Sequence, residues 1–371
     1  MNNKSEKQSS DGRTSAEGKP SVYFAPVPDG AGMDVIIRKL KDLLNTADFD
    51  GWVPGGTMIA VKTHFGEARN KTHIPPPVFK PLAARIRQSG GVPFLTETST
   101  LYKGRRSDSV SHCLLAHEHG FTPDATDMPV ILADGIKGEY EIPVKIRGTM
   151  YDQVMIAGLC ARFGGLVCMS HPTGHIACGF GGAIKNLGMG LASRKGKLEM
   201  HSAMHPSVNQ NTCAKCWRCE KFCPENAIER TQQGARIDPT RCIGCGECLV
   251  ECSFGAIKIN WGSDSEQLQK KIAEHAYGVI INTTSFHINY CINFTADCDC
   301  MGKDQKKACP DIGLFGGTDP VAVDQACIDY IRKVSGQDIG DLAYAGIDYT
   351  IQLRHAEEIG MGSRKYNISE C

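Results

Sequence analysis

The stretch CAKCWRCEKFCPENAIE, residues 213–229, is followed by CIGCGECLVECSFGAIK, residues 242–258, and both have the spacing C-x-x-C-x-x-C-x-x-x-C. Three thiolates at successive x-x steps can wrap one iron–sulfur cubane from a single tight loop, and the fourth ligand must come from elsewhere. Zinc is the alternative, but a zinc ribbon uses two separated C-x-x-C pairs and has no use for the third and fourth cysteines of each block. The spacing therefore predicts two [4Fe-4S] clusters.

This repeat resembles the cysteine pattern of bacterial ferredoxins, in which the last cysteine of each block ligates the other cluster. The resemblance implies the following ligand sets: Cys213, Cys216, Cys219 and Cys252 for cluster one, and Cys242, Cys245, Cys248 and Cys223 for cluster two. Pro224 follows the first block as the motif expects, whereas Ser253 stands at that place after the second. Ala227 and Ala256 occupy the same offset after their blocks, which indicates an internal duplication.

Composition narrows the class of protein. Among 371 residues, 41 Lys and Arg balance 41 Asp and Glu, which argues against a nucleic-acid partner. No run of about 18 apolar residues occurs, so we expect no membrane span. Residues 1–20 are polar and predict a disordered tail with no signal peptide. The 18 cysteines then indicate metal ligands and reduced thiols in a cytoplasmic protein that meets a redox partner protein.

Outside the cysteine blocks, short apolar runs alternate with amphipathic segments, which is typical of an α/β fold. The pattern predicts strands at 21–26, 57–66, 92–100, 128–134, 165–173 and 284–294, an edge strand or hairpin at 140–146, and helices near 78–89, 107–119, 264–276, 320–334 and 346–358. We expect a mainly parallel mixed sheet with helices on both faces. This α/β domain spans 21–206 and 261–371, and an inserted ferredoxin-like α+β module occupies 207–260.

A glycine-rich turn just before the module holds the densest chemistry. Gly181 and Gly182 lead into a helix start at Ala183, where backbone N–H groups favour an anion, so we interpret these glycines and Asn186 as cofactor-binding. Around the turn lie His171, His175, Lys185, Lys197, His201 and His205. We select His175, Lys185 and His201 as catalytic candidates. The alternative is a surface turn with solvated His and Lys side chains.

Two further groups of polar residues are candidates. KTHFGE, residues 62–67, follows a predicted strand where ligands of open α/β sheets bind, and it offers His64 as a catalytic residue. DCDC, residues 297–300, places Cys298 and Cys300 one residue apart beside two carboxylates, a pattern that suits an additional metal or a redox thiol. The alternatives are a polar loop and an idle reduced loop. Asp319 is expected to cap the helix that begins near Pro320.

These segments together resemble a family of uncharacterised iron–sulfur centre proteins, the domain of unknown function 362. The resemblance rests on KTHFGE, the stretch G-H-x-x-x-G-F-G-G-A-I-K-N, the DCDC loop, and PDIG followed by DPVAVDQA. It implies an α/β fold with clusters and no known reaction. The spacing of His175, Lys185 and His201 is also distantly similar to that of nickel-pincer lactate racemases. That similarity implies Lys185 as the cofactor tether, His201 as the nickel ligand and His175 as acid or base.

The fusion of a cluster module to such a site predicts a function. We expect two [4Fe-4S] clusters to exchange electrons with a small anionic substrate or a small-molecule cofactor, with lysine holding the anion and histidine supplying protons. One alternative is a non-enzymatic electron carrier or cluster-delivery protein whose α/β domain only docks a partner. A second alternative is a racemase-like hydride shuttle with a lysine-tethered nickel cofactor.

Overall fold

The protein is described by a computed structural model that covers residues 18–102, 104–201, 206–223, 225–242, 247–258 and 265–371. Most of the predicted tail lies outside these residues, and so do His205, Pro224 and Cys245. No helix in the described ranges is long and apolar enough to cross a membrane.

The main body is built on one seven-stranded sheet with the order β15-β1-β14-β13-β6-β2-β3. Its strands are β1 (Ser21–Pro26), β2 (Met58–Lys62), β3 (Val92–Thr96), β6 (Gly165–Ser170), β13 (Ser285–Cys291), β14 (Gly313–Gly317) and β15 (Asn367–Glu370). The neighbours β13·β6, β6·β2, β2·β3 and β1·β15 run parallel, whereas β14 is antiparallel to both β1 and β13. The predicted mixed, mainly parallel sheet is confirmed.

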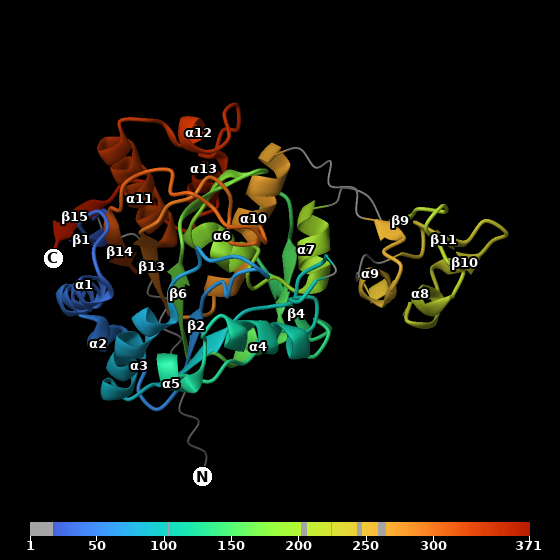
Figure 1. Ribbon diagram of the computed structural model, residues 1–371, viewed down its shortest axis with the longest axis horizontal. Coiled ribbons are helices and arrows are strands. Elements are labelled where there is room, and N and C mark those ends of the chain that lie inside the picture. The colour runs from blue at the N-terminus through green and yellow to red at the C-terminus, as the bar shows by residue number, and fades with distance from the viewer. Residues whose placement is uncertain (1–17, 103, 202–205, 224, 243–246, 259–264) are drawn as a thin grey trace, which may run out of the picture.

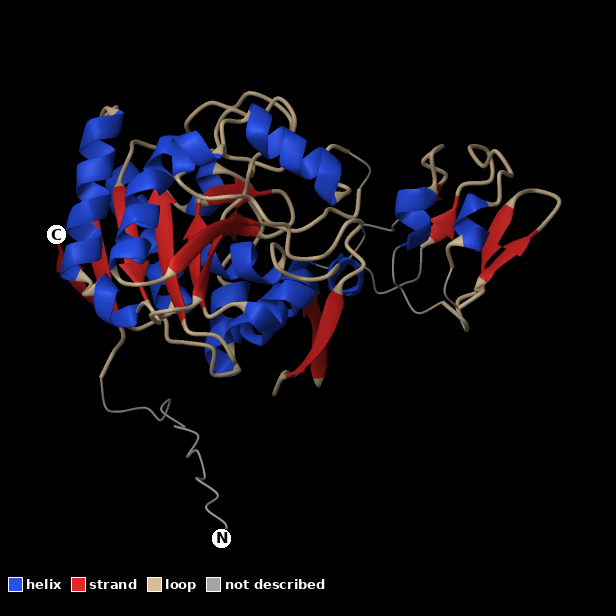
Figure 2. Ribbon diagram, turned by 90° about the horizontal axis from the view of Figure 1, so that it is seen from below, coloured by secondary structure: helices blue, strands red, loops and turns tan. Residues whose placement is uncertain are grey.

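Helices cover both faces of this sheet, as Figures 1 and 2 show. One face packs on α1 (Met33–Thr46) and α3 (Phe79–Gln88), and the other on α6 (Ala183–Gly188), α10 (Ser265–Ile280), α11 (Pro320–Ser335) and α13 (Ile351–Glu358). Side chains alternate between the two cores, so that Ile59 and Val61 belong to one core and Ala60 to the other. Burial on both faces explains the nearly continuous apolar runs of the central strands.

Helix α11 begins as the sequence predicts. The Asp319 carboxylate accepts hydrogen bonds from the backbone N–H groups of Val321 and Ala322, both at 2.9 Å, and Pro320 occupies the first turn. Gly336 ends the helix with φ of 68°, a left-handed conformation that glycine adopts without strain. This capped helix packs on β13 and α6, and it holds Asp324 in the protein interior.

The remaining elements surround this core. They are α2 (Phe49–Trp52), α4 (Ser109–Glu118), α5 (Pro123–Thr126), α7 (Arg194–His201), α12 (Ile339–Leu342) and the 3₁₀ turns η1 (Pro76–Val78) and η2 (Gly158–Arg162). The predicted hairpin near 140–146 is formed by β4 (Glu141–Lys145) and β5 (Gln153–Ala157). A second hairpin, β7 (Thr173–His175) with β8 (Gly179–Gly181), lies inside the glycine-rich turn, where we had not expected strands.

The predicted strand at 128–134 is wrong. This segment lies along β3, with Leu95 N donating to Pro129 O (2.8 Å) and Ile131 N donating to Leu95 O (2.9 Å), but it forms only an isolated bridge between Leu95 and Val130. Pro129 has no N–H to donate, and the hydroxyl of Thr96 occupies Ile131 O at 2.8 Å. A regular ladder therefore does not develop.

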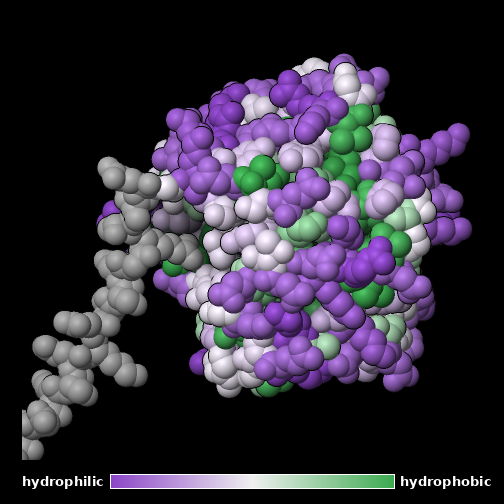
Figure 3. Space-filling model, turned by 90° about the vertical axis from the view of Figure 1, so that its left-hand side faces the viewer, coloured by the Kyte–Doolittle hydropathy of each residue, from purple (hydrophilic) through white to green (hydrophobic). Residues whose placement is uncertain are grey.

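Strand β15 is an edge strand that the sequence did not reveal. Its four residues, NISE, are all exposed and pair with β1 through a parallel register that starts at Ser21 and Asn367. Polar side chains on a short edge strand discourage pairing with another chain. Figure 3 shows this side of the molecule as mostly hydrophilic, with small separate apolar patches.

The segment with the cysteine blocks forms small elements that pair with one another. Strand β9 (Ser207–Val208) is antiparallel to β12 (Ile257–Lys258), and β10 (Ile228–Arg230) is antiparallel to β11 (Ala235–Ile237). The helices α8 (Arg218–Lys221) and α9 (Glu247–Glu251) pack between them. Figure 1 shows these elements beside the α/β body, with α9 on the side of α7 and β4. The exact division into 21–206 with 261–371 and 207–260 stays a prediction.

Candidate functional site

The cysteine blocks bring sulfur atoms together in the way a cluster requires. Four cysteines line one small cavity, namely Cys213, Cys216, Cys219 and Cys252. These are the residues that the ferredoxin resemblance assigns to cluster one, including the ligand from the second block. The loop between Cys213 and Cys219 coils tightly, because Lys215 and Trp217 have left-handed φ values of 53° and 60°. A converging set of four thiols fits an iron–sulfur cubane.

The two blocks also repeat one hydrogen bond. Ala227 N donates to Cys223 Sγ, and Ala256 N donates to Cys252 Sγ, each at 3.2 Å. Ala227 and Ala256 are the pair at the same offset in the duplicated sequence, and N–H donors to ligand sulfurs tune a cluster's reduction potential. Of the predicted ligands to cluster two, Cys223, Cys242 and Cys248 are described and Cys245 lies outside the described residues.

Helix α9 joins this module to the α/β body. Leu249 packs against Leu101 and Leu198, two buried residues of the body. Glu251 forms ion pairs with Lys137 of the body and with Arg218 of the module, the latter at 2.9 Å. The same short helix carries Cys248 and is followed directly by Cys252. Predicted ligands of both clusters therefore lie on or next to the segment that contacts the body.

A cavity of about 710 Å³ lies in the α/β body at the carboxyl ends of the parallel strands. Lys62 ends β2, Glu97 follows β3, His171 follows β6, and the DCDC loop follows β13. Helices α6, α7 and α10, the β7–β8 hairpin and the loop that contains Arg106 supply most of the remaining wall. All of the predicted site residues outside the cysteine blocks line this cavity: His64, His175, Gly181, Gly182, Lys185, Asn186, His201, Cys298 and Cys300.

Positive charge dominates the cavity wall. Four lysine and arginine side chains line it, Lys62, Arg106, Lys185 and Lys197, against the two carboxylates of Glu97 and Asp299.

Three of these cations are held by protein groups. Lys62 Nζ lies 2.8 Å from a Glu97 oxygen, Arg106 Nε lies 3.0 Å from Glu67, and Lys197 Nζ donates to Ser99 O at 2.5 Å. Arg106 was missed by sequence reasoning, since it follows a loop with no signal beyond a pair of arginines.

Lys185 is the exception among the cavity cations. Within the ranges that the structure describes, its ammonium forms no hydrogen bond or ion pair. Gly181 makes room for its stem, because a Cβ at that position would lie 2.8 Å from Lys185 Cδ. Burial lowers the pKa of Lys185 below its ordinary value of 10.5, and the nearby Cys178 opposes this shift. An unpaired cation in a positive cavity is suited to an anionic ligand.

The three catalytic histidine candidates are neutral near neutral pH. Burial, with Arg106 and Lys62 nearby, lowers the pKa of His64 well below its usual value. Burial and then Lys185 do the same for the pKa of His175, and they lower the pKa of His201 to about 4. The lysine ammonium that lines the cavity without a hydrogen bond or ion pair to the described residues is therefore Lys185, and His64, His175 and His201 add neutral rings to the wall.

His171 is the opposite case. Its Nδ1 lies 2.8 Å from Asp299 Oδ2, and its Nε2 lies 3.1 Å from Ile292 O and 3.2 Å from Asn293 O. All three partners can only accept, so both ring nitrogens donate and the ring is an imidazolium. Burial works against this charge, but Asp299 and the two carbonyls raise the pKa of His171 above its ordinary value. His171 is thus one half of a buried ion pair under the DCDC loop.

The N–H groups at the helix start at Ala183 are already bound by a carboxylate of the protein, which corrects our expectation that they favour an external anion. The N–H groups of Ala183 and Ile184 donate to the carboxylate of Asp324, at 2.6 and 2.9 Å, and Asn289 donates to it at 2.7 Å. A Cβ on Gly182 would lie 2.3 Å from Asp324 Oδ1, so glycine is needed for this approach. The protein's own carboxylate occupies the site.

The side-chain amide of Asn186 is likewise hydrogen-bonded to other protein groups. Its amide nitrogen donates to Ser170 Oγ at 3.0 Å, and its Oδ1 accepts from Lys62 Nζ at 2.8 Å. This amide fixes the end of β6 against the Lys62 ammonium, while its remaining surface lines the cavity. His73, six residues after KTHFGE, is not among the cavity-lining residues and stacks on His119 with ring centroids 4.8 Å apart.

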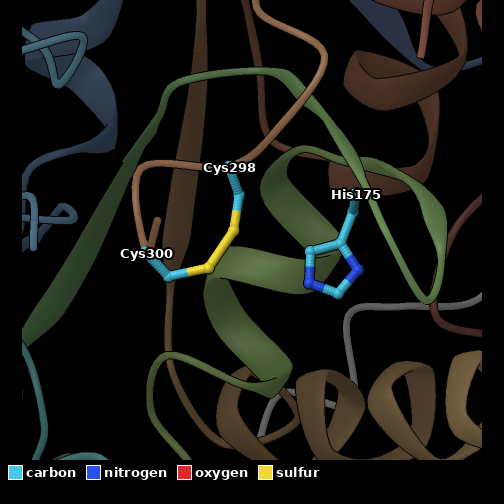
Figure 4. Close-up of side chains that lie close together, drawn as sticks. All are labelled: His175, Cys298 and Cys300. Atoms are coloured by element: carbon cyan, nitrogen blue, oxygen red, sulfur yellow. A yellow bond between two sulfur atoms is a disulfide. The ribbon is translucent and has the colours of Figure 1, made fainter. Parts of the chain in front are cut away.

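The DCDC loop is anchored by its carboxylates. Asp299 accepts from Thr72 Oγ1 at 2.7 Å as well as pairing with His171, and Asp297 pairs with Lys303 at 2.6 Å and with the Tyr344 hydroxyl. The two cysteines are joined by a disulfide, with Cα atoms 5.3 Å apart, where we had expected reduced thiols. Figure 4 shows the imidazole of His175 facing this sulfur pair.

These features define a class: an α/β protein with a ferredoxin-type cysteine module and a cationic cavity. The family described as "Domain of unknown function (DUF362)" matches residues 59–329. The chain belongs to this family. The match covers the strand that precedes KTHFGE, the glycine-rich turn, the cysteine module and most of α11.

Similarity to individual proteins covers short stretches of the chain. Pyruvate synthase subunit PorD of Methanothermobacter marburgensis is 35% identical over 68 residues, which are 18% of this chain and 80% of that protein. Electron transport protein HydN of Escherichia coli is 37% identical over 57 residues, 14% of this chain and 33% of that protein.

A weak likeness to a solved structure covers most of the chain. The lactate racemase apoprotein of Thermoanaerobacterium thermosaccharolyticum aligns with 85% of this chain and 58% of its own length, at 13% identity and a TM-score of 0.41. A likeness at this level carries no argument about chemistry.

Proposed function

We propose that this chain is an iron–sulfur redox protein in which two [4Fe-4S] clusters exchange electrons with a small anionic substrate or cofactor in the α/β cavity. The clusters would be held by the two cysteine sets that cross over between the blocks, and each supplies one-electron transfer when bound. Relatives named as an electron transport protein and as a pyruvate synthase subunit are 37% and 35% identical to stretches of 57 and 68 residues, which supports electron transfer with a redox partner protein.

The observation that carries this proposal is the placement of α9. Leu249 lies against Leu101 and Leu198, while the predicted ligands Cys248 and Cys252 flank it in the chain. Leu101 itself lines the cavity, and Lys197, next to Leu198, lines it too. Cluster ligands and cavity wall thus share one small apolar contact. Such a contact favours a module that exchanges electrons with the cavity over a module that has only a structural role.

The cavity chemistry favours an anion. Lys185 offers an unpaired ammonium among the described residues, and its lowered pKa makes it a better acid than an ordinary lysine. Neutral His175 and His201 add hydrogen-bonding groups without further charge. In this arrangement Lys185 binds the anion and holds the proton, and the histidines orient the ligand.

The surface of the module supports docking of an external redox partner. Phe254 is 55% exposed and Phe222 is 40% exposed, and each lies within two residues of a predicted cluster ligand, Cys252 or Cys223. Exposed aromatic side chains are enriched in protein interfaces. We infer a cytoplasmic location, because a reducing compartment preserves the cluster thiolates.

The test is reoxidation of reduced clusters by small anions. Anaerobic protein is reduced with dithionite, freed of excess reductant, and mixed with a panel of small carboxylates, phosphates and sulfur oxyanions while cluster absorbance is followed. We expect at least one anion to restore the absorbance of the wild type and to act at least tenfold more slowly on Lys185→Gln. Lys333→Gln, which removes an exposed charge on α11 far from the cavity wall, is the matched control.

A carrier or cluster-delivery protein would behave differently. Its clusters would be reduced and read by electron paramagnetic resonance, but no anion would reoxidise the wild type faster than Lys185→Gln. Intact-protein mass spectrometry adds a further check, since a covalent adduct at Lys185 would indicate a tethered cofactor and favour the hydride-shuttle alternative.

A further inference from the structure

The sulfur pair of the DCDC loop lies in the wall of the proposed substrate cavity. Cys298 and Cys300 both line this cavity, and their sulfurs are close enough to be bonded to each other. Cys298 is only 8% exposed and Cys300 is half-buried, and both are lining residues of the cavity. Two cysteines separated by one residue, opening on a ligand cavity, can store or deliver two electrons as a disulfide and a dithiol.

The loop holds these sulfurs in place by contacts that leave the sulfurs themselves free for chemistry. Asp299 O accepts a hydrogen bond from Glu67 N at 2.9 Å, and Cys298 O accepts one from Gln305 Nε2 at 3.2 Å. The Asp299 carboxylate is paired with His171. The Asp299 carboxylate and the main chain of the loop are therefore engaged by protein groups, whereas no hydrogen bond to either sulfur is formed within the described residues.

The hydrogen bonds of His175 show which of its ring nitrogens can donate to the sulfurs. The backbone N–H groups of Ala177 and Cys178 donate to His175 Nδ1, at 3.2 and 3.1 Å. A backbone N–H can only donate, so Nδ1 must be the unprotonated nitrogen and Nε2 carries the proton of the neutral ring. Figure 4 shows Nε2, the ring nitrogen that is not bonded to Cγ, on the side of the ring that faces the sulfurs. His175 thus presents an N–H donor to the pair.

The orientation of His175 favours a redox pair over a metal site at Cys298 and Cys300. The ligand atoms of His175, Cys298 and Cys300 lie within 4.8 Å of one another, a spacing that a metal ion could use. A metal-binding histidine, however, normally donates its other ring N–H to an acceptor, and here the other nitrogen accepts two N–H groups. The neighbouring carboxylates are also compensated by Lys303 and His171, so they do not require a cation.

The geometry points to a dithiol/disulfide centre formed by Cys298 and Cys300 that relays two electrons between the clusters and the anion bound in the cavity. This inference rests on the proposed function. Two electrons, which the two clusters would supply one each when bound, break the S–S bond and leave two thiolates. In the return step the two thiolates give two electrons to the bound acceptor, the protons that its reduction requires come from Lys185 or from water, and the S–S bond forms again.

The cavity stabilises the reduced form of this centre. The His175 Nε2–H is directed at the sulfurs, and Lys185 contributes a positive charge to the same wall. A charge-assisted hydrogen bond and a nearby cation both favour thiolate over thiol. Two clusters match the two electrons of a disulfide, so no one-electron sulfur species has to accumulate. The substrate class is therefore a small anion that accepts or donates electrons in pairs.

The test follows the thiols while the clusters are reduced. Anaerobic holoprotein is reduced stepwise with photoreduced deazaflavin, quenched in acid, alkylated with N-ethylmaleimide under denaturing conditions, and digested for mass spectrometry. We expect the peptide that contains Cys298 and Cys300 to pass from no label to two labels in one two-electron transition after the clusters are reduced. Cys219→Ala, which removes a ligand of cluster one, should slow this reduction at least tenfold, whereas Cys113→Ser should not change it.

Histidine 175 has its own test. In His175→Ala the donor is lost, and we expect the pH at which the reduced pair reacts half-maximally with iodoacetamide to rise, with roughly tenfold slower alkylation below it. His175→Gln keeps an N–H donor and should restore much of the rate. A histidine with only a packing role would give the same pH profile in both variants.

Three results would overturn the inference. The pair could stay disulfide-bonded after full cluster reduction, it could remain as two thiols after mild oxidation, or the holoprotein could contain about one metal ion other than cluster iron that Cys298→Ser loses. The last result would assign the loop to a metal. Each differs from failure of the proposed function, because anion-dependent reoxidation of the clusters that persists in Cys298→Ser would leave that function standing without the relay.

Discussion

The cluster module and the α/β cavity are assembled from the chain in opposite ways. The module draws its thiols from two blocks that lie within 40 residues of sequence, and local spacing alone brings Cys213, Cys216 and Cys219 into one loop. The cavity draws its wall from segments that extend from Lys62 to Ile347 and meet only when the sheet has formed. The comparison teaches that a metal site can be local while the site it serves depends on the whole fold.

Breaking the module should have the largest effect and should leave the body intact. Cys219→Ala removes one of the four sulfurs that share the cluster-one cavity, so we expect iron to fall from about eight per chain toward about four, because the iron that loses its thiolate is released and the incomplete cluster is held less firmly. Iron analysis and electron paramagnetic resonance on anaerobic protein measure this. Unchanged iron would contradict the ligand assignment, and Cys113→Ser on α4 should keep all of it.

Removing a buried carboxylate from the centre of the α/β body should have the next largest effect, a loss of stability with no loss of cluster iron. Asp324→Ala leaves the N–H groups of Ala183 and Ile184 and the amide of Asn289 without their acceptor in a buried place. At about 1–3 kcal/mol for each unsatisfied group, part of which relaxation recovers, we expect a loss of about 4 kcal/mol in the free energy of unfolding. Urea unfolding followed by far-ultraviolet circular dichroism measures it.

The control for this substitution is Asp341→Ala. Asp341 is an exposed carboxylate on α12, and its removal should change stability by no more than about 0.5 kcal/mol. Equal effects of the two substitutions would mean that the clip between α11 and the start of α6 is not a stabilising element. Iron content should stay near the wild-type value in both variants, because neither residue contacts the module.

Lowering the pH should reduce the stability of the α/β body through a buried histidine, and this effect should be smaller than the two above. His275 on α10 is fully buried, its Nδ1 donates to Lys271 O at 2.9 Å, and burial lowers its pKa from 6.5 to about 4. Between these values the unfolded chain binds more protons than the folded one, so stability is fully present above pH 6.5 and is lost as the pH falls toward 4. The loss from this one group is at most about 3 kcal/mol.

The measurement is urea unfolding at pH 7 and at pH 5 for the wild type and His275→Gln. We expect His275→Gln to show a smaller difference between the two pH values, even if it is less stable at both. A difference equal to that of the wild type would assign the acid sensitivity to other groups, of which His73, with a pKa lowered by burial to about 4, is the next candidate.

Much of the fold could be predicted because it depends on local patterns. The buried central strands read as apolar runs, and Asp319 with Pro320 marked the start of α11, as the structure confirms. The segment 128–134 has the same apolar character but lacks the donor at Pro129, so it stops at a single bridge. Strand β15 is polar and exposed, and nothing in NISE distinguishes it from a tail.

The chain by itself determined the cysteine spacing, the duplication and the apolar pattern of the sheet, because each depends on residues close together in sequence. The tertiary structure alone decided the charge and the partners of the site residues. His171 is an imidazolium because Asp299 and two carbonyls surround it, and His175 is neutral because two backbone N–H groups face its Nδ1. Such states depend on atoms brought from distant segments, and a sequence pattern does not specify which atoms those are.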